Sequence, residues 1–455
     1  HPHKWVFGER GSLSNLKYLP VLVVEKLEAD EVEIQVDATA ANFRDVLNVL
    51  GSYIDRTVDV DDFLKTNPGP IGGDVSGRVL RFGSNVKNFK VGDKVWGVGS
   101  DSFGDRVVTN QHLLVKSSNR LSQAEYAGLP IVTMTIEHSL VNLAHIKKGD
   151  WVLVHSGAGG IGQTVVQYCK IFGAKLVATC SSEEKRNLLT SQGVEYVFNS
   201  RDPEDFMKSY KTILGEQKLR IVVNSLSDNY IPYSMDLLDS TDGIFIEIGK
   251  RGIWTDEEVS AEYPGIAYHR VKLDHMIAKQ PEEAGKLLQA VNRRIEESEL
   301  HTLATKEYDM KNAIEAFRFL QSGKNLGKLV LVNGHNNYNT GVQTDSNVAK
   351  GSVIITGGTG SLGCHLARWL IMNGYQSIQL LSRSGKYPPE LDDLKDKVSV
   401  ASLDCTDREA VNGYFEKLNK TPLGIVCCAG VLRDQMLPNS NDVEDLEKYT
   451  KDYDL

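Results

Sequence analysis

Two glycine-rich turns of the sequence are candidates for binding a diphosphate. One lies in VLVHSGAGGIGQTVVQ (152–167) and the other in VIITGGTGSLGCHLA (353–367). Each turn follows an apolar run typical of a strand and precedes a helical pattern, so the backbone can approach the ligand and the helix N-terminus faces its negative charge. A glycine turn can also serve only tight packing, but this strand–turn–helix context favours dinucleotide binding. The residues predicted to contact the dinucleotide at the first turn are Gly157, Ala158, Gly159, Gly160, Ile161 and Gly162.

The strand after the first turn indicates which dinucleotide binds. A carboxylate at its end would accept hydrogen bonds from the ribose of NAD. Here KLVATC (175–180) is followed by hydroxyl and basic side chains, which suit the additional phosphate of NADP. The alternative is that the basic residues form a solvated helix face; we expect NADPH. The residues concerned are Ser181, Ser182, Lys185 and Arg186, with Arg201 as a further candidate.

The pattern of apolar residues around the two glycine turns predicts the domains that position them. Residues 1–130 contain short β-like runs separated by Gly-Asp and Gly-Ser turns, which predict a β-rich, barrel-like domain. In residues 131–269 apolar strands alternate with helical periods, as in a doubly wound parallel sheet. We expect residues 270–334, which end in the strand-like KLVLVNG, to complete the barrel. The polar segment 335–350 predicts a linker, and a second β–α series occupies 351–455.

Composition excludes several classes of protein. The 455 residues are 41% hydrophobic and 24% charged, which is typical of a soluble protein of two or three domains. A net charge of −9 without any basic run argues against nucleic-acid binding. No apolar stretch approaches the roughly 18–20 residues that span a membrane, and no signal peptide is evident, so we expect a cytoplasmic protein. The six cysteines lack paired spacing and are expected to be buried free thiols.

The order of several motifs resembles one group of enzymes. The motifs and their order are similar to those of the enoyl reductase domains of animal-type fatty acid synthases and reducing polyketide synthases. These domains belong to the medium-chain dehydrogenase/reductase superfamily. The resemblance covers roughly residues 5–335. The motifs are ANFRDVLNVLGSY (41–53), GGDVSG (72–77), VGDKVWGV (91–98), HSGAGGIGQ (155–163), SSEEKR (181–186), VVNSLSDNY (222–230) and FIEIGK (245–250).

This resemblance implies both a fold and a reaction. The fold is a GroES-like barrel domain plus a Rossmann domain, and the reaction is NADPH-dependent reduction of 2-enoyl thioesters. The substrate is an acyl chain linked to the phosphopantetheine of an acyl carrier protein, and a homodimer is expected because the family commonly pairs through its nucleotide-binding sheets. Zinc-dependent relatives place a cysteine within the AANFRDV segment and a histidine at Gly73-Asp74; both are missing, so we expect no metal and a structural role for Asp74.

The resemblance also points to catalytic candidates. Lys250 ends an apolar strand at the carboxyl edge of the predicted sheet, where it could stabilise an enolate or donate a proton. Asp274, expected in a later strand, could keep that ammonium charged and oriented. Tyr53 stands where the polyketide synthase group has a tyrosine implicated in α-carbon protonation, and Thr135 matches a position beside the nicotinamide. Without the resemblance, ordinary surface roles would be the default.

The second β–α series resembles the ketoreductase domains of the same synthases, in the short-chain dehydrogenase/reductase superfamily. The motifs are TGGTGSLG (356–363), LLSRSG (380–385) and AGVLRD (429–434). A ketoreductase also needs a lysine, for which Lys448 is the candidate and Lys451 the alternative, and then a serine and a tyrosine that do not follow here. We therefore expect an incomplete Rossmann-like domain. The predicted cofactor contacts are Gly358, Gly360, Ser361, Leu362, Gly363, Ser382, Arg383 and Asp404.

Two other functions remain open. A stand-alone, zinc-free quinone or alkenal reductase would share the glycine turn, but the NFRDV motif and the ketoreductase-like segment argue against it. A non-catalytic dimerisation scaffold would not need intact glycine turns or the Lys250–Asp274 pair.

Overall fold

The chain forms two compact units, His1–Tyr338 and Asn339–Leu455, in a computed structural model. The predictions for Tyr53, the linker 335–350, Lys448 and Lys451 lie outside the residues that the structure describes. No helix in the described part of the chain is long and apolar enough to cross a membrane. The described residues are 2–21, 26–51, 70–227, 229–250, 252–334, 352–372, 375, 377–418, 422 and 424–428.

The first unit contains a seven-stranded, largely antiparallel sheet. Its order is β14-β15-β3-β4-β5-β7, with β6 also paired to β3. Apolar side chains of β3 such as Val32, Ile34 and Val36 are fully buried and alternate along the strand, so they lie on the same face of the sheet. A separate antiparallel pair joins β1 (His3–Val6) and β2 (Lys17–Pro20). The strands of the large sheet are β3 (Glu31–Ala41), β4 (Asp74–Phe82), β5 (Lys94–Val98), β6 (Arg106–Asn110), β7 (Leu114–Lys116), β14 (Thr305–Asp309) and β15 (Lys328–Val332).

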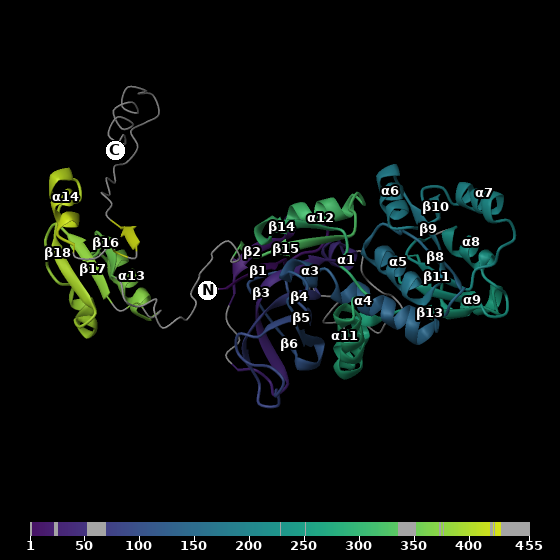
Figure 1. The fold of residues 1–455 in the computed structure, drawn as a ribbon, viewed down its shortest axis with the longest axis horizontal. Helices are drawn as coiled ribbons and strands as arrows, with labels where there is room; N and C mark the ends of the chain where they lie inside the picture. The colour runs from purple at the N-terminus through teal and green to yellow at the C-terminus, as the bar shows by residue number, and fades with distance from the viewer. Residues whose placement is uncertain are drawn as a thin grey trace, which may run out of the picture. The chain divides into compact units, whose positions relative to one another are not determined.

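The same unit contains a six-stranded parallel sheet in the order β10-β9-β8-β11-β12-β13. Numbered from its own first strand this is 3-2-1-4-5-6, the doubly wound order of dinucleotide-binding folds. The predicted fold class is therefore confirmed. The strands are β8 (Trp151–Val154), β9 (Lys175–Cys180), β10 (Tyr196–Asn199), β11 (Ile221–Asn224), β12 (Ile244–Glu247) and β13 (Ala267–Arg270). The connecting helices are α5 (Gly160–Phe172), α6 (Glu183–Ser191), α7 (Pro203–Leu214), α8 (Tyr230–Leu237) and α9 (Asp256–Glu262), shown in teal in Figure 1.

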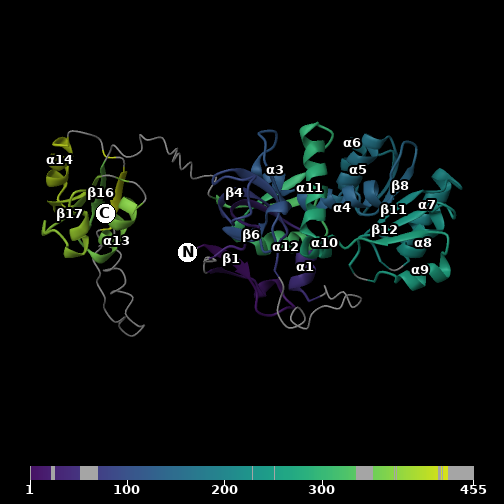
Figure 2. The same cartoon turned by 90° about the horizontal axis from the view of Figure 1, so that it is seen from below.

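Further helices pack between and around the two sheets. In Figure 1 and Figure 2, α4 (Pro130–Ile136) and α11 (Pro281–Glu296) lie between the barrel strands and the six-stranded sheet. The segment from Leu273 to Glu296 forms two helices, because Pro281 disfavours a helical conformation at Gln280 (φ −139°). The remaining helices are α1 (Phe43–Val49), α3 (Gln123–Ala127), α10 (Leu273–Lys279), α12 (Ala313–Gln321), the π-helix η3 (Glu137–Leu143) and the short 3₁₀ turns η1 (Leu13–Asn15), η2 (Gln111–Leu113) and η4 (Met310–Asn312).

The second unit contains a four-stranded parallel sheet in the order β18-β17-β16-β19. Its two faces bury alternate side chains: Ile355 packs on the face of α13, and Ile354 on the face of α14. The cysteines are free thiols, but Cys427 is exposed because it lies on the edge strand β19, so the expectation of burial was wrong there. The elements are β16 (Ser352–Thr356), β17 (Ser377–Ser382), β18 (Val398–Ser402), β19 (Gly424–Cys427), α13 (Ser361–Met372), α14 (Arg408–Glu416) and η6 (Pro389–Leu394).

Candidate active site

The first glycine turn joins β8 to α5 and leaves space for a ligand. A Cβ atom on Gly162 would lie 2.2 Å from the carbonyl oxygen of Gly157, so the turn can close only with glycine at this position. At Gly159, which caps the helix, the nearest atom would be 3.4 Å away. The N–H groups of the first helical turn have no partner within the helix. This geometry fits the diphosphate of a dinucleotide.

A buried ion pair lies against this turn. The ammonium of Lys328 lies 3.0 Å from the Asp74 carboxylate and donates to Asn42 Oδ1 at 2.7 Å; the lysine and aspartate side chains are 3% and 0% exposed. Asp74 also accepts from the Asn42 amide (2.8 Å) and from the backbone N–H of Ile131 (2.7 Å). A Cβ atom on Gly160 would lie 2.8 Å from the lysine Cδ, so the lysine stem packs against the start of α5. The network ties β4, β15 and the N-terminus of α1 to α4 and α5.

This network occupies the two segments that hold zinc ligands in zinc-dependent relatives. The first segment contributes Asn42 and the second contributes Asp74, and the ammonium of Lys328 lies between them. A metal ion placed there would be repelled by this ammonium. Within the described residues, no group of three or more histidine, cysteine or acidic side chains could hold a metal ion. These residues do not fit a zinc site.

Lys250 and Asp274 lie next to each other at the carboxyl edge of the six-stranded sheet. The lysine Nζ is 3.8 Å from Asp274 Oδ1 and donates to the carbonyl oxygen of Val271 at 3.5 Å. Their side chains are 28% and 25% exposed, so solvent reaches them only partly. The carboxyl edge of such a sheet is where doubly wound folds bind ligands. A cation held there by a carboxylate can stabilise a developing anion or donate a proton.

The expectation that Asp274 belongs to a strand was wrong. It is the second residue of α10, which begins at Leu273. An acidic side chain in the first turn of a helix is favoured by the partial positive charge of the helix N-terminus, and that local preference explains the helix here.

The side chains predicted to select NADPH gather after β9 and β10. Ser182 caps α6 by accepting from the backbone N–H of Lys185. The ammonium of Lys185 donates to the carbonyl oxygen of Gly323 at 2.6 Å, and Arg201 Nε donates to that of Ser181 at 2.8 Å. Burial lowers the pKa of Lys185 from its ordinary value. Thr135 is buried in α4 and donates its hydroxyl to the carbonyl of the residue one turn earlier.

The second glycine turn has a similar construction. Gly357 has a φ of +63°, and a Cβ atom on Gly363 would lie 2.5 Å from Gly358 Cα. α13 begins at Ser361 directly after this turn. Among the other predicted contacts, Leu362 is exposed, Gly360 would tolerate a Cβ atom, Ser382 ends β17, and Arg383 follows it. Asp404 accepts hydrogen bonds from the N–H and hydroxyl of Thr406, which lower its pKa together with the charge of Arg383.

Two functional candidates were not singled out from the sequence. Asn224 and Glu247 are the last residues of β11 and β12, they pair in register, and both are buried. Burial raises the pKa of Glu247 to about 7, although hydrogen bonds from Asn224 and the backbone of Gly249 and the charge of Lys250 oppose that shift. The signal that could have found them is a polar residue closing an apolar run at the carboxyl edge of the sheet.

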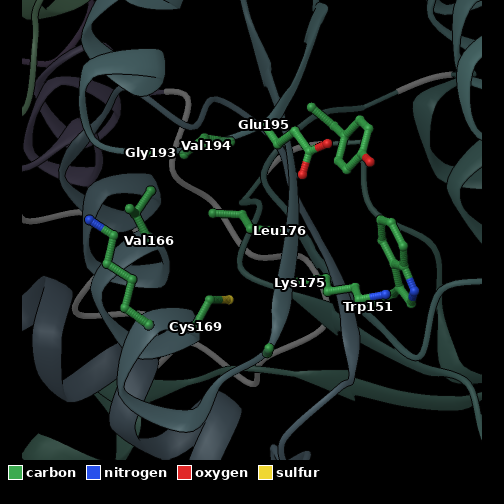
Figure 3. Close-up of a pocket in the computed structure, with 11 residues that line it drawn as sticks. Trp151, Val166, Cys169, Lys175, Leu176, Gly193, Val194 and Glu195 are labelled. Carbon is green, nitrogen blue, oxygen red and sulfur yellow. The ribbon is translucent and has the colours of Figure 1, made fainter.

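A pocket of about 320 Å³ lies at the other edge of the six-stranded sheet (Figure 3). Trp151, Lys175 and Tyr196 are the first residues of β8, β9 and β10, so this pocket opens at the amino ends of the strands. It is therefore separate from the glycine turn and from Lys250.

Comparisons with known proteins agree with this geometry. The Alcohol dehydrogenase GroES-like domain model matches residues 28–185, the Zinc-binding dehydrogenase model 160–293, and the KR domain model 351–451. A solved structure of the CurK enoyl reductase is 32% identical, with a TM-score of 0.67, and the match covers 73% of this chain and 99% of that one. The chain belongs to the enoyl reductase family. The family resemblance found in the sequence is thus confirmed.

Two further proteins are similar to this chain, one in sequence and one in fold. The pikromycin polyketide synthase component PikAII of Streptomyces venezuelae is 32% identical over 97% of this chain, but the chain spans only 11% of that relative's length. The quinone oxidoreductase of Escherichia coli, solved in complex with NADPH, shares the fold with a TM-score of 0.64 at 22% identity, over 72% of this chain and 99% of that one.

Proposed function

We propose that the first unit reduces the double bond of 2-enoyl thioesters with NADPH. The observation that carries this proposal is the pairing of Lys250 with Asp274 at the same sheet edge as the glycine turn. Bound NADPH would supply the hydride for the β-carbon of the substrate. The ammonium of Lys250 stabilises the negative charge that develops on the thioester oxygen and can return a proton to the α-carbon. Asp274 holds that ammonium in position, with its Oδ1 3.8 Å from the lysine Nζ.

The cofactor assignment rests on two groups of residues. The glycine turn 157–162 and the start of α5 hold the diphosphate. Arg201 and Lys185, beside the end of β9, bind the 2′-phosphate that distinguishes NADPH from NADH. In the second unit, the glycine turn 357–363 and Arg383 would hold a second molecule of the same cofactor.

The similarity to PikAII supports a place within a polyketide synthase. We therefore propose that the acyl substrate arrives on the phosphopantetheine of an acyl carrier protein, and that two copies pair through β13, an edge strand of the six-stranded sheet. The fatty acid synthase alternative lacks this support. Tyr53 remains proposed as a proton donor to the α-carbon.

Steady-state NADPH oxidation with crotonyl and longer trans-2-enoyl pantetheine thioesters tests the function. Lys250→Ala is expected to lower kcat by about a hundredfold or more, because the enolate loses its cation. Lys279→Ala, an exposed lysine on α10, is the matched control and should retain wild-type kcat. Tyr53→Phe is expected to slow protonation.

Different results would favour the alternatives. A quinone or alkenal reductase would reduce free enones at least as fast as the thioesters. A scaffold would show no NADPH binding in a fluorescence titration. If Lys250→Ala reduced enoyl thioesters at the wild-type rate, the proposed role of this lysine would be wrong.

A further inference from the structure

Glu247 and Asn224 form a buried polar pair beside the proposed site. They end β12 and β11 and lie opposite each other in the parallel ladder. Glu247 is 1% exposed and Asn224 is fully buried. Burying a carboxylate is costly unless its oxygens are hydrogen-bonded, so the contacts of this pair are informative.

The two side chains bond to each other, and their other hydrogen bonds run to the loops at the sheet edge. Glu247 accepts from the backbone N–H of Gly249 at Oε1 (2.6 Å) and from the Asn224 amide at Oε2 (2.7 Å). Asn224 in turn donates to the carbonyl of Leu226 (2.8 Å) and accepts from its N–H (3.1 Å). One carboxylate thus fixes the loop after β12 and, through Asn224, the loop after β11. A Cβ atom on Gly249 would lie 2.6 Å from Oε1, so the fit is tight.

These contacts define where Lys250 stands. Lys250 follows Gly249 directly, and its Nζ reaches Asp274 Oδ1 and the carbonyl of Val271. The N–H of Val271 donates to the backbone carbonyl of Glu247 at 2.9 Å. Glu247 therefore contacts the backbone near each partner of the lysine–aspartate pair, at Gly249 before Lys250 and at Val271 before Asp274.

We propose that Glu247, together with Asn224, is the positioning residue that holds the loop carrying Lys250 so that its ammonium stays beside Asp274. This inference rests on the proposed function, because Lys250 is the group that acts on the substrate. Both partners of the carboxyl group are N–H donors, so both of its oxygens must accept. Only the carboxylate form satisfies both donors fully.

Two substitutions test this polarity. The glutamine of Glu247→Gln has one acceptor and one donor, so its amide N–H group faces the N–H donor of either Gly249 or Asn224. We expect kcat to fall at least tenfold while the Kd for NADPH changes less than twofold. The double variant Asn224→Asp/Glu247→Gln reverses donor and acceptor across the pair and keeps the bonds to the N–H groups of Gly249 and Leu226. It loses the bond from residue 224 to the Leu226 carbonyl, so we expect a partial recovery. It should recover kcat at least threefold relative to Glu247→Gln.

Glu33→Gln changes another buried acid, paired with Arg81 in the barrel, and should leave kcat unchanged. Wild-type kcat in Glu247→Gln, a matching loss of NADPH affinity, or a double variant no faster than Glu247→Gln would each overturn the proposal.

A second readout separates this inference from the proposed function. The rate at which an amine-acylating reagent labels Lys250, measured by mass spectrometry, should change at least threefold in Glu247→Gln, with Lys279 unchanged. If wild type reduces no enoyl thioester, the proposed function fails, but the labelling still decides the positioning role. An unchanged labelling rate of Lys250 would overturn that role.

Discussion

Replacing Lys328 by methionine is expected to destabilise the first unit by about 3 kcal/mol. Breaking a buried ion pair costs roughly 3–5 kcal/mol, because the remaining charge stays buried without its partner. Asp74 would keep two hydrogen-bond donors, the Asn42 amide and the N–H of Ile131. We therefore expect the lower end of that range.

Removing both charges should cost less than removing one. In Lys328→Met/Asp74→Leu neither charge of this pair remains, and apolar replacement of a buried ion pair is often neutral. The double variant is therefore expected to be more stable than Lys328→Met alone, despite the lost bonds from the Asn42 amide and the Ile131 N–H to Asp74.

Urea unfolding followed by tryptophan fluorescence measures these differences. Trp369 is the one tryptophan of residues 339–455, so a Trp369→Phe background makes the signal report the first unit. Lys116→Met is the matched control. The side chains of its pair with Asp93 are 53% and 25% exposed, and this pair should contribute less than about 1 kcal/mol. Equal losses in Lys328→Met and Lys116→Met, or a double variant less stable than Lys328→Met, would refute the reasoning.

Three further predictions concern the turn, pH and the cofactor. Gly162→Ala should lower the free energy of unfolding in urea by about 3 kcal/mol, because its Cβ has no room, whereas Gly159→Ala should cost less than about 1 kcal/mol; equal costs would contradict the geometry. Because burial raises the pKa of Glu247 from 4.5 to about 7, the folded state binds that proton more tightly, and the free energy of unfolding should fall by up to about 3 kcal/mol as pH rises through this interval. In urea titrations at pH 5 and pH 8, Glu247→Gln should reduce the difference between the two free energies of unfolding. An unchanged difference would contradict the assignment of this pH dependence to Glu247. Arg201→Ala should raise the KM for NADPH at least tenfold and leave that for NADH nearly unchanged; an equal rise for both cofactors would exclude a contact with the 2′-phosphate.

Much of the fold could be predicted from local pattern. Short apolar runs such as VLVH and KLVATC, each followed by a helical period, specify parallel strands, and the glycines after the first run indicate the turn. The helical position of Asp274 was missed because the apolar pattern of YHRVKLDHM suits a strand as well as a helix.

The buried polar contacts were harder to predict. Lys328 meets Asp74 across 254 residues, and Glu247 meets Asn224 across 23. Sequence periodicity reports which face of an element is apolar, but not which distant polar group will meet it. The closeness of Lys250 and Asp274 was expected from the family resemblance and not from spacing.

The pairing of β15 with β3 has a consequence for how the chain is made. The lysine that opens β15 bonds to the carbonyl of Ala41 at the end of β3, 287 residues earlier. At about 5–20 residues per second, a ribosome needs roughly 15–60 s to deliver that partner. The strands β8 to β13 are contiguous in sequence and emerge within that interval. The nucleotide-binding sheet can therefore fold during synthesis before the barrel sheet is complete. Until β15 emerges, the residues Ala38–Ala41 at the end of β3 lack the strand that pairs with them in the folded unit.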